Sequence, residues 1–518
     1  MKLRSLITAG MVLAGSVAFA TAQAKDLKMA YDADPVTLDI HEQLSGGVLQ
    51  LSHMSFDPLI RWTKDLSFEN RLATSYERLD PTTVRFKLRE GVKFHSGNPM
   101  TAADFKWTFD RLKQSPDFKG IFANFSALNV IDDLTIDLVT TGPYPLVLHT
   151  ATYIFPMDSK FYTGTDANGN DKGAIVKNGA SFASTNLSGT GPYTVESREQ
   201  GVKLVFKRFA DYWDTDSKGN VENIVFTPIK DEQTRVAALL SGGVDFIAPV
   251  SPNDFGQIES SDSVNLITMP GTRIITFQLN QERKAEFKDV RVRQAMVHAV
   301  NNEAIVQKIM KGFATTAGQM SPPGYLGYNP DLTPRFDLDK AKALMKEAGL
   351  EDGFSVTMMA PNNRYVNDDK IAQAVAAMLS KINIKVDLQT MPKAQYWPTF
   401  DERAADIMMI GWHSDTEDSA NFYEFLSMTP DADTGMGAYN SGNYSDDFVD
   451  TTTVAANMET DPAKRAEMLQ AVETKIYEDA GFIPLHWQNL AWAARKGVNL
   501  DPIVNALNFP YLGDLVID

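Results

Sequence analysis

Hydrophobic and polar residues follow two different periods along this chain. In the segment 84–94, VRFKLREGVKF, apolar and charged residues alternate one by one, which predicts a half-buried β-strand. In DVRVRQAMVHAV (289–300) and DLDKAKALMKEAG (337–349) the apolar residues recur every three or four positions, which predicts amphipathic helices. Asp337 occupies the N-cap position of the second helix, and Gly349 stands just after its end. The pattern therefore predicts both strands and capped helices.

These patterns are distributed unevenly over the two halves of the chain. From residue 271 to residue 487 helices and strands alternate, as in the strand DIMMIGW (406–412) and the helix TDPAKRAEMLQAVETKIYEDA (460–480). Such alternation predicts an α/β domain with a largely parallel sheet. The first half is richer in strands and turns and is predicted to be α+β. The fold class expected for the whole chain is α/β.

The first 24 residues have the three parts of a secretory signal peptide. Lys2 and Arg4 precede a short apolar core at 6–17, and small residues surround a cleavage site at 22–24. The apolar core is shorter than a membrane-spanning helix. We therefore expect export to the periplasm with cleavage after Ala24, and a soluble, monomeric mature protein.

The amino-acid composition excludes several kinds of binding partner and several kinds of reactive site. The 518 residues carry a formal net charge of −17 and contain no cysteine. An acidic chain lacks the basic face that nucleic-acid phosphates require, so no nucleic-acid partner is expected. Without cysteine there are no disulfides, thiolate metal sites or cysteine nucleophiles. The chain also has no G-x-S-x-G and no H-E-x-x-H motif, so neither of these hydrolase types is expected, and the chain is predicted not to be an enzyme.

Five segments, in the expected order, resemble one family closely. They are LDIH (38–41), LREGVKFHSGNPMTAADFKWTFDR (88–111), GTGPY (189–193), DVRVRQAMVHAVNNEAIV (289–306) and DLDKAKALMKEAGLEDGF (337–354). The chain resembles the periplasmic solute-binding proteins of family 5, the dipeptide, oligopeptide and nickel type, which serve ABC importers. The resemblance implies two partners, a small-molecule solute of peptide-like character and an inner-membrane ABC permease. It implies no cofactor.

The resemblance also implies an architecture, a type II periplasmic-binding-protein fold with two lobes, a hinge and an extra α+β domain in the N-terminal lobe. The implied units are domain I (25–59, 187–270 and 488–518), domain II (60–186) and domain III (271–487). The chain is expected to cross between the lobes near 269–275 and near 484–491. Two crossings make a hinge, which lets such proteins close around a ligand.

The stretch IGWHSDTEDSANF (410–422) places three carboxylates beside a histidine and a tryptophan. In peptide-binding relatives the matching loop carries an aspartate that pairs with the terminal amine of the peptide, which implies this role for Asp415. The segment APNNRY (360–365) matches a loop whose arginine pairs with the ligand carboxylate, which implies this role for Arg364. Both loops follow predicted strands of one sheet, and loops at the carboxyl ends of parallel strands form a ligand crevice. A buried zwitterion needs both of its charges met.

Other interpretations of the charged residues remain open. Arg364 could form an interdomain salt bridge, and Asp415 could cap a turn or a helix. Asp418 is interpreted as the N-cap of the helix that follows it, and Glu417 as a solvated side chain.

Further ligand contacts are expected from glycine and aromatic residues near the cleft. Paired glycines let the backbone approach a ligand closely, and aromatic faces cover apolar parts of it. The expected contacts are Gly46 in the segment LSGGV, Tyr365, Tyr396, Trp397 and Trp412.

His413 is a further candidate contact, and it raises the question of a metal. The seven histidines are scattered and form no H-x-x-x-H or H-x-H pair, so a bare metal site is not expected. A metal chelate such as a nickel complex, a sugar or an opine remains an alternative solute. A periplasmic hydrolase with Asp415 and Asp418 as acid and base is a weaker alternative. A receptor adaptor with the same fold is not distinguished from an importer subunit.

Overall fold

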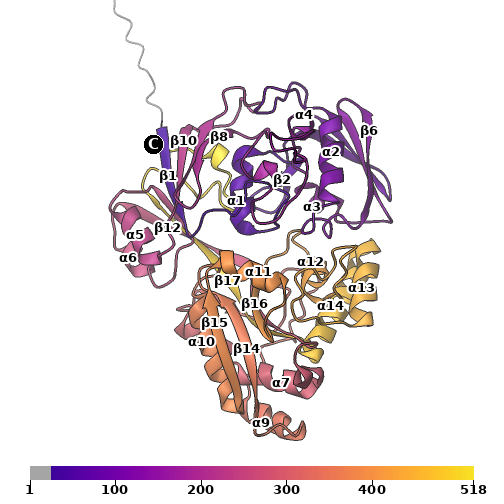
Figure 1. Cartoon of the computed structure of the whole chain (residues 1–518), viewed down its shortest axis with the longest axis vertical. Coiled ribbons are helices and arrows are strands. Elements are labelled where there is room, and N and C mark those ends of the chain that lie inside the picture. Colours follow the sequence, from indigo (N-terminus) through magenta and orange to yellow (C-terminus); the bar gives the residue numbers. More distant parts are fainter. Residues whose placement is uncertain (1–24) are drawn as a thin grey trace, which may run out of the picture.

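Two long antiparallel strands, β12 (Val264–Leu279) and β17 (Phe482–Arg495), run from one lobe of the protein into the other (Figure 1). The structure is a computed structural model and describes residues 25–518. Both strands belong to an 11-stranded sheet in the order β15-β14-β16-β12-β17-β11-β1-β10-β9-β8, with β13 paired to β17. Their pairing shifts register between Met269 and Arg273 and again between Ile275 and Thr276. The expected crossings, 269–275 and 484–491, fall within these two strands.

The N-terminal lobe, above the crossing in Figure 1, contains the β8 end of this sheet. Its strands and helices are β1 (Lys25–Tyr31), β8 (Tyr193–Glu199), β9 (Lys203–Arg208), β10 (Val221–Pro228), β11 (Phe246–Ala248), α1 (Gly46–Ser55), α5 (Glu232–Leu240) and α6 (Phe255–Glu259). Strand β1 is parallel to both β10 and β11. Leu27 and Met29 are completely buried and alternate with the exposed Asp26 and Lys28, whereas Ala30 is buried on the opposite face at the end of the strand.

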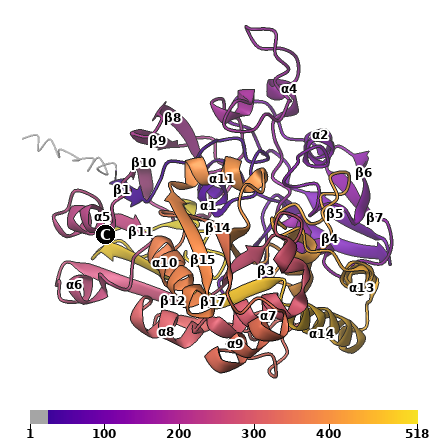
Figure 2. The ribbon, with the colours of Figure 1, turned by 60° about the horizontal axis from the view of Figure 1, so that its bottom comes forward.

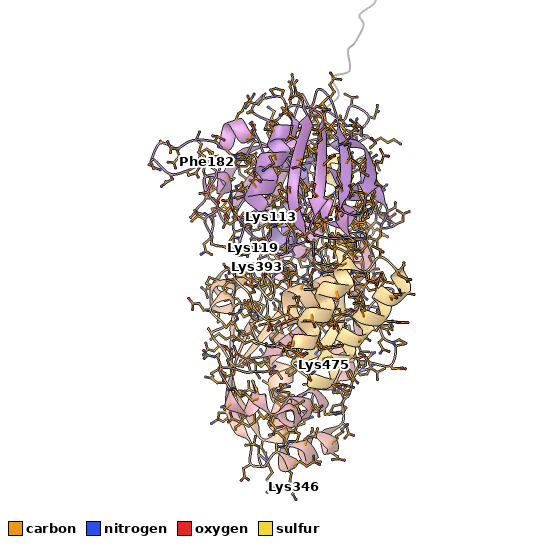
Figure 3. All side chains as sticks on the ribbon, turned by 90° about the vertical axis from the view of Figure 1, so that its right-hand side faces the viewer. Lys113, Lys119, Phe182, Lys346, Lys393 and Lys475 are labelled. Carbon is orange, nitrogen blue, oxygen red and sulfur yellow. The ribbon has the colours of Figure 1, made fainter. Side chains whose placement is uncertain are left out.

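A second, antiparallel sheet with the order β4-β5-β7-β6 extends the N-terminal lobe. The elements of this part are β2 (Ile60–Trp62), β3 (Phe68–Asn70), β4 (Ala73–Asp80), β5 (Thr83–Leu88), β6 (Phe125–Asp132), β7 (Thr135–Thr140), α2 (Ala102–Leu112), α3 (Val147–Ala151) and α4 (Ser159–Tyr162). In β5, Val84, Phe86 and Leu88 are buried while the charged residues between them are not, as the alternation predicted. Figure 3 shows this sheet above the helices of the other lobe.

The C-terminal lobe is built from strands and helices that alternate along the chain. Its elements are α7 (Val290–Ala299), α8 (Asn302–Lys308), β13 (Ala314–Thr316), α9 (Leu338–Glu347), β14 (Phe354–Pro361), α10 (Asp368–Leu379), β15 (Ile384–Met391), α11 (Lys393–Asp401), β16 (Ile407–Trp412), α12 (Ser419–Phe422), α13 (Asp447–Met458) and α14 (Pro462–Asp479). Helix α10 packs on β14 and β15, and α9 packs on α7 (Figure 2). The expected α/β class is confirmed, and no helix within residues 25–518 is long and apolar enough to cross a membrane.

The prediction of a largely parallel sheet in this lobe is only partly right. Strands β15, β14 and β16 are parallel to one another, but β12 is antiparallel to both β16 and β17. The reason is connectivity, because the chain enters the lobe along β12 and leaves it along β17. The capping predictions are confirmed: the Asp337 carboxylate accepts a hydrogen bond from the Lys340 amide, and Gly349 has a left-handed φ of 72°.

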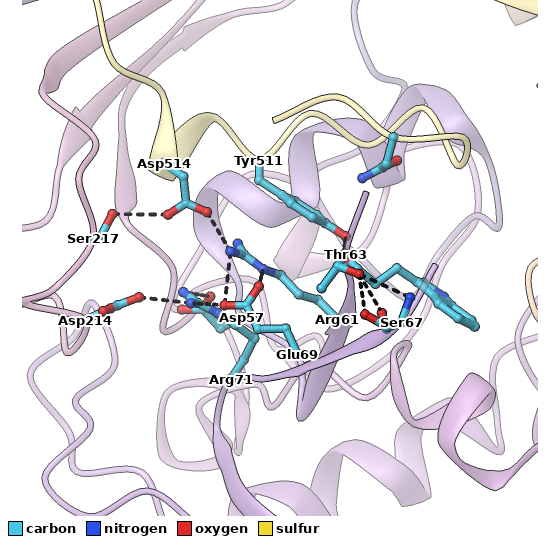
Figure 4. A network of polar contacts seen from close by, with 12 residues as sticks. Asp57, Arg61, Thr63, Ser67, Glu69, Arg71, Asp214, Ser217, Tyr511 and Asp514 are labelled. Atoms are coloured by element: carbon cyan, nitrogen blue, oxygen red, sulfur yellow. Dashed lines mark hydrogen bonds and ion pairs between the residues drawn. The ribbon is translucent and has the colours of Figure 1, made fainter. Parts of the chain in front are cut away.

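A buried polar network joins three distant segments of the N-terminal lobe (Figure 4). The guanidinium of Arg71 lies 3.3 Å from the Asp57 carboxylate and 2.9 Å from that of Asp214. The Arg61 guanidinium lies 2.9 Å from Glu69 and 2.6 Å from Asp514, close to the C-terminus. Breaking a buried ion pair by removing one partner costs about 3–5 kcal/mol. The network therefore fixes the C-terminal segment against residues 57–71.

Candidate functional site

Three adjoining cavities lie between the lobes, and Arg364 lines all of them. The inner cavity, about 30 Å³, and the middle cavity, about 60 Å³, also share Gly46 and Arg273. The outer cavity, about 680 Å³, shares Asp32 and Val366 with the middle one and is bordered by exposed residues. The three cavities therefore adjoin one another between the lobes, and the outer one lies nearest to the exposed surface.

The loops after β14 and β16 meet at the inner cavity, as their position in a parallel sheet predicted. Arg364 follows the end of β14, and Asp415 follows the end of β16. The Asp368 carboxylate, in the first turn of α10, accepts hydrogen bonds from the amides of Arg364 at 2.8 Å and Tyr365 at 3.0 Å. Burial raises the pKa of Asp368 to about 6. This carboxylate holds the loop that presents Arg364 to the cavities.

The Arg364 guanidinium is half-buried and faces the cavities. Within residues 25–518 it has no carboxylate within 4.0 Å, and its Nε atom is buried without a hydrogen-bond partner. The guanidinium carbon lies 4.9 Å from the centre of the Tyr365 ring. The described part of the chain therefore provides no interdomain salt bridge for Arg364, and its fork of donors is free to receive an anion.

Asp415 is 3% exposed and lies where the two lobes meet. Its Oδ1 atom accepts a hydrogen bond of 3.0 Å from the Tyr153 hydroxyl of the N-terminal lobe, while Oδ2 is buried without a partner. Its side chain accepts no backbone hydrogen bond from the described residues, so it does not cap a turn there. Burial raises the pKa of Asp415 to about 7, against the lowering effects of the Tyr153 hydrogen bond and the Arg273 charge. The free Oδ2 atom can accept a hydrogen bond from a donor such as an ammonium group.

Two cations at the site were not predicted, Arg273 and Lys393. Arg273 lies on β12 at its register shift, donates to the Gly411 carbonyl at 3.0 Å and lines the inner and middle cavities. Burial and the nearby Arg364 charge lower its pKa to about 10. Lys393, labelled between the lobes in Figure 3, lies 3.5 Å from Asp32 of the N-terminal lobe. The sequence feature that could have identified Arg273 is its place at the start of the apolar strand RIITFQL, where the chain was expected to cross between the lobes.

The aromatic wall of the inner cavity consists of Trp397, Trp412 and Tyr439. The Trp412 ring stacks on Phe425 with centroids 5.1 Å apart, and its Nε1 donates to the Asn421 side chain at 2.9 Å. Gly46, at the start of α1, also lines this cavity, as predicted for a close backbone approach.

Two predicted aromatic contacts, Tyr396 and Tyr365, are not part of the wall of the inner cavity. Tyr396 is completely buried and donates to the Met409 carbonyl at 2.6 Å, so its expected place in the aromatic wall is wrong. Tyr365 is 5% exposed, donates to the Gly411 carbonyl at 3.3 Å and borders only the outer cavity. The hydroxyl groups of both rings donate to backbone carbonyls of β16.

The remaining residues of the stretch 410–422 have distinct environments. His413 lines the inner cavity, and burial lowers its pKa to about 3, so it is neutral. Asp418 is confirmed as the N-cap of α12, and it also forms a two-pronged ion pair with Arg465 at 2.6 and 2.7 Å. Glu417 was expected to be solvated, and this is wrong. It is half-buried, accepts a hydrogen bond from the Tyr325 hydroxyl, and burial raises its pKa to about 7.

No group of three or more His, Asp and Glu side chains in residues 25–518 is arranged to hold a metal ion. The site is instead a buried cleft with one unsatisfied carboxylate oxygen and two arginines that lack anionic partners. Chemically, such an arrangement can offer a hydrogen-bond acceptor to a cationic group and donors to an anionic one.

Two lobes with a charged cleft between them are typical of solute-binding proteins. The sequence model of the bacterial extracellular solute-binding proteins, family 5 (middle), matches residues 67–433, and the chain belongs to this family. It is 28% identical over 453 residues to the dipeptide-binding protein of Escherichia coli (strain K12), covering 82% of each chain. It is 26% identical to the glutathione-binding protein GsiB of Shigella dysenteriae serotype 1, covering 95% of this chain and 94% of the relative.

Solved structures agree on the fold. A dipeptide-binding protein from Pseudoalteromonas sp. SM9913, in complex with Met-Leu, superimposes with a TM-score of 0.86 at 23% identity, covering 95% of this chain and 100% of that one. The periplasmic binding protein DppA from Helicobacter pylori, in complex with the peptide STSA, gives a TM-score of 0.84 at 23% identity, covering 95% and 98%. The type II periplasmic-binding-protein fold is therefore confirmed.

Proposed function

We propose that the protein captures a short zwitterionic peptide between its two lobes and delivers it to the permease of an ABC importer. The observation that carries this proposal is the pairing of opposite charges around one inter-lobe cavity. Asp415 offers a free carboxylate oxygen to the terminal ammonium, and Arg364 offers its guanidinium to a carboxylate. The relatives named for dipeptides and for glutathione support a peptide-like solute.

The proposed capture uses the two crossing strands as a hinge between domains I and III, with domain II as an extension of the N-terminal lobe. Three polar contacts bridge the lobes around the cavities. The Tyr153 hydroxyl donates to Asp415, the Tyr439 hydroxyl donates to Asp117 at 3.0 Å, and Lys393 pairs with Asp32. Since Asp415 and Tyr439 both line the inner cavity, a solute that contacts them also favours the closed arrangement of the lobes. Closure in turn gives the permease a distinct surface to recognise.

The location and partners of the mature protein follow from this role. We expect it to act as a periplasmic monomer, released by cleavage after Ala24; that site lies outside the described residues. The relatives found are named as binding proteins, which supports a binding role.

A ligand screen by thermal shift tests the proposal. The mature protein is screened against dipeptides, tripeptides, sugars, opines and nickel–histidine complexes. A ligand at one hundred times its Kd adds about 2.7 kcal/mol of stability, which gives a readable rise in Tm. Matched peptides with an acetylated amine or an amidated carboxyl group are the controls, and each is expected to lose most of the shift. A shift with an uncharged sugar and none with peptides contradicts the peptide assignment and leaves family membership intact.

A further inference from the structure

The inner and middle cavities carry more positive than negative charge. Their charged lining residues are the cations Arg273, Arg364 and Lys393 and the anions Asp32 and Asp415. Lys393 already has Asp32 as a partner, whereas neither arginine has a carboxylate within 4.0 Å among residues 25–518. His413 is neutral, and Arg273 remains cationic near pH 7 because its pKa is lowered only to about 10. With Asp415 ionised, the lining has one more positive charge than negative charges.

The two arginines converge on one point of the cleft. A β-carbon built on Gly46 would lie 3.6 Å from Nη2 of Arg273 and 3.8 Å from Nη2 of Arg364. Gly46 lines both the inner and the middle cavity, so the guanidiniums flank the junction of the two. Arg273 donates one hydrogen bond to the Gly411 carbonyl, which orients it without neutralising it. Two like charges held this close repel each other, and anions bound between or beside them offset the repulsion.

We infer that the solute is an acidic short peptide or amino-acid conjugate with two carboxylates and one ammonium group. This inference rests on the proposed peptide-binding function and specifies its ligand. Arg364 receives one carboxylate, Arg273 receives the second, and Asp415 receives the ammonium. A neutral zwitterion would leave one positive charge uncompensated in the closed cleft, which is costly, whereas a solute of net charge −1 balances the site.

Isothermal titration calorimetry at pH 7.5 with two matched peptide pairs tests the inference. The pairs are Ala-Glu with Ala-Gln and Asp-Ala with Asn-Ala, so that each pair differs by one negative charge at nearly constant shape. At least one acidic peptide is expected to bind about 10- to 100-fold more tightly than its amide partner, the range for a hydrogen-bonded charge. In the Arg273→Gln variant that advantage is expected to disappear, while the Kd of the amide peptide changes less than about threefold.

Two controls keep the outcome interpretable. Arg291→Gln removes an exposed arginine on α7 that pairs with Asp289, far from the cavities, and it is expected to leave all four affinities unchanged. If Arg273→Gln does not fold, the comparison of acidic and amide peptides on the wild-type protein decides alone. Equal affinities within both pairs overturn the inference while the peptide-binding function stands. An equal loss for acidic and amide peptides in Arg273→Gln shows that both arginines clamp one carboxylate, which also overturns it. Binding of no peptide overturns the proposed function and the inference with it.

Discussion

Replacing Asp415 by asparagine is expected to weaken peptide binding and to stabilise the empty protein. Burial raises the pKa of this carboxyl group from 3.8 to about 7. The folded empty protein therefore favours the neutral form, and its stability falls as pH rises from about 4 to about 7, where the buried group ionises. A pKa change of this size corresponds to about 4 kcal/mol at higher pH. Asparagine retains the acceptor for the Tyr153 hydroxyl and cannot ionise, so the variant is expected to regain part of that energy.

Binding has the opposite dependence on pH, because the peptide ammonium requires the ionised carboxylate. With a free-protein pKa of about 7, the ionised fraction falls about 50-fold between pH 7 and pH 5. The Kd of a short peptide is therefore expected to rise by up to about 50-fold, or about 2 kcal/mol, over this range. The terminal ammonium and carboxylate of the peptide keep their charges throughout.

The assay is calorimetric titration of one peptide at pH 7, 6 and 5, together with the Tm of the empty protein at pH 5 and pH 8. In Asp415→Asn, binding is expected to be weak at every pH and nearly independent of it, and Tm at pH 8 is expected to rise. Glu417 and Glu424 also act electrostatically on this region, with pKa values raised by burial to about 7 and about 8. A wild-type Kd that is flat from pH 7 to pH 5 refutes the assignment of Asp415 to the ammonium. If the Kd of Asp415→Asn depends on pH as strongly as that of the wild type, the pH dependence of binding is assigned to Glu417 and Glu424 instead.

Three further changes separate binding from folding. Arg364→Ala is expected to weaken the binding of any carboxylate-bearing peptide by about 2–5 kcal/mol. Its Tm is expected to change little, since the side chain has no ion pair in the described structure. An unchanged affinity measured by calorimetry removes Arg364 from the site. Asp418→Ala removes a helix cap and leaves Arg465 buried without its partner, so chemical denaturation is expected to show a loss of about 3–5 kcal/mol, with peptide affinity of the folded fraction preserved. Gly271→Ala places a β-carbon 2.2 Å from the Gln488 carbonyl oxygen, between the two crossing strands. Thermal melting is therefore expected to show a lower Tm, and X-ray scattering a smaller ligand-induced decrease in radius of gyration. Wild-type values for both quantities exclude a tight strand contact there.

Features that depend on neighbouring residues could be predicted from the sequence. Alternation in β5, the cap at Asp337 and the cap at Asp418 each depend on residues within a few positions, and all three are as predicted. The proximity of Arg364 to Asp415 also followed from sequence, because both loops leave the carboxyl ends of parallel strands.

Side-chain environments at the cleft depend on segments that are far apart in the chain. Tyr153, which bonds Asp415, comes from the N-terminal lobe more than 250 positions earlier, and no local pattern connects the two. Glu417 is half-buried and accepts a hydrogen bond from Tyr325, which lies 92 positions earlier, although its neighbours in sequence are polar.

The sequence by itself determined the class of fold, the helix caps and the closeness of the two loops after β14 and β16, because these depend on periodicity and on neighbouring residues, while the roles of Arg364 and Asp415 came from the resemblance to family 5. Only the tertiary structure decided that Arg273 joins Arg364 at Gly46 and that Tyr396 turns into the core. The direction of a side chain at the edge of a strand or helix is set by packing against other segments. The balance of charge in the cleft, and hence the kind of solute it favours, is therefore a property of the assembled lobes.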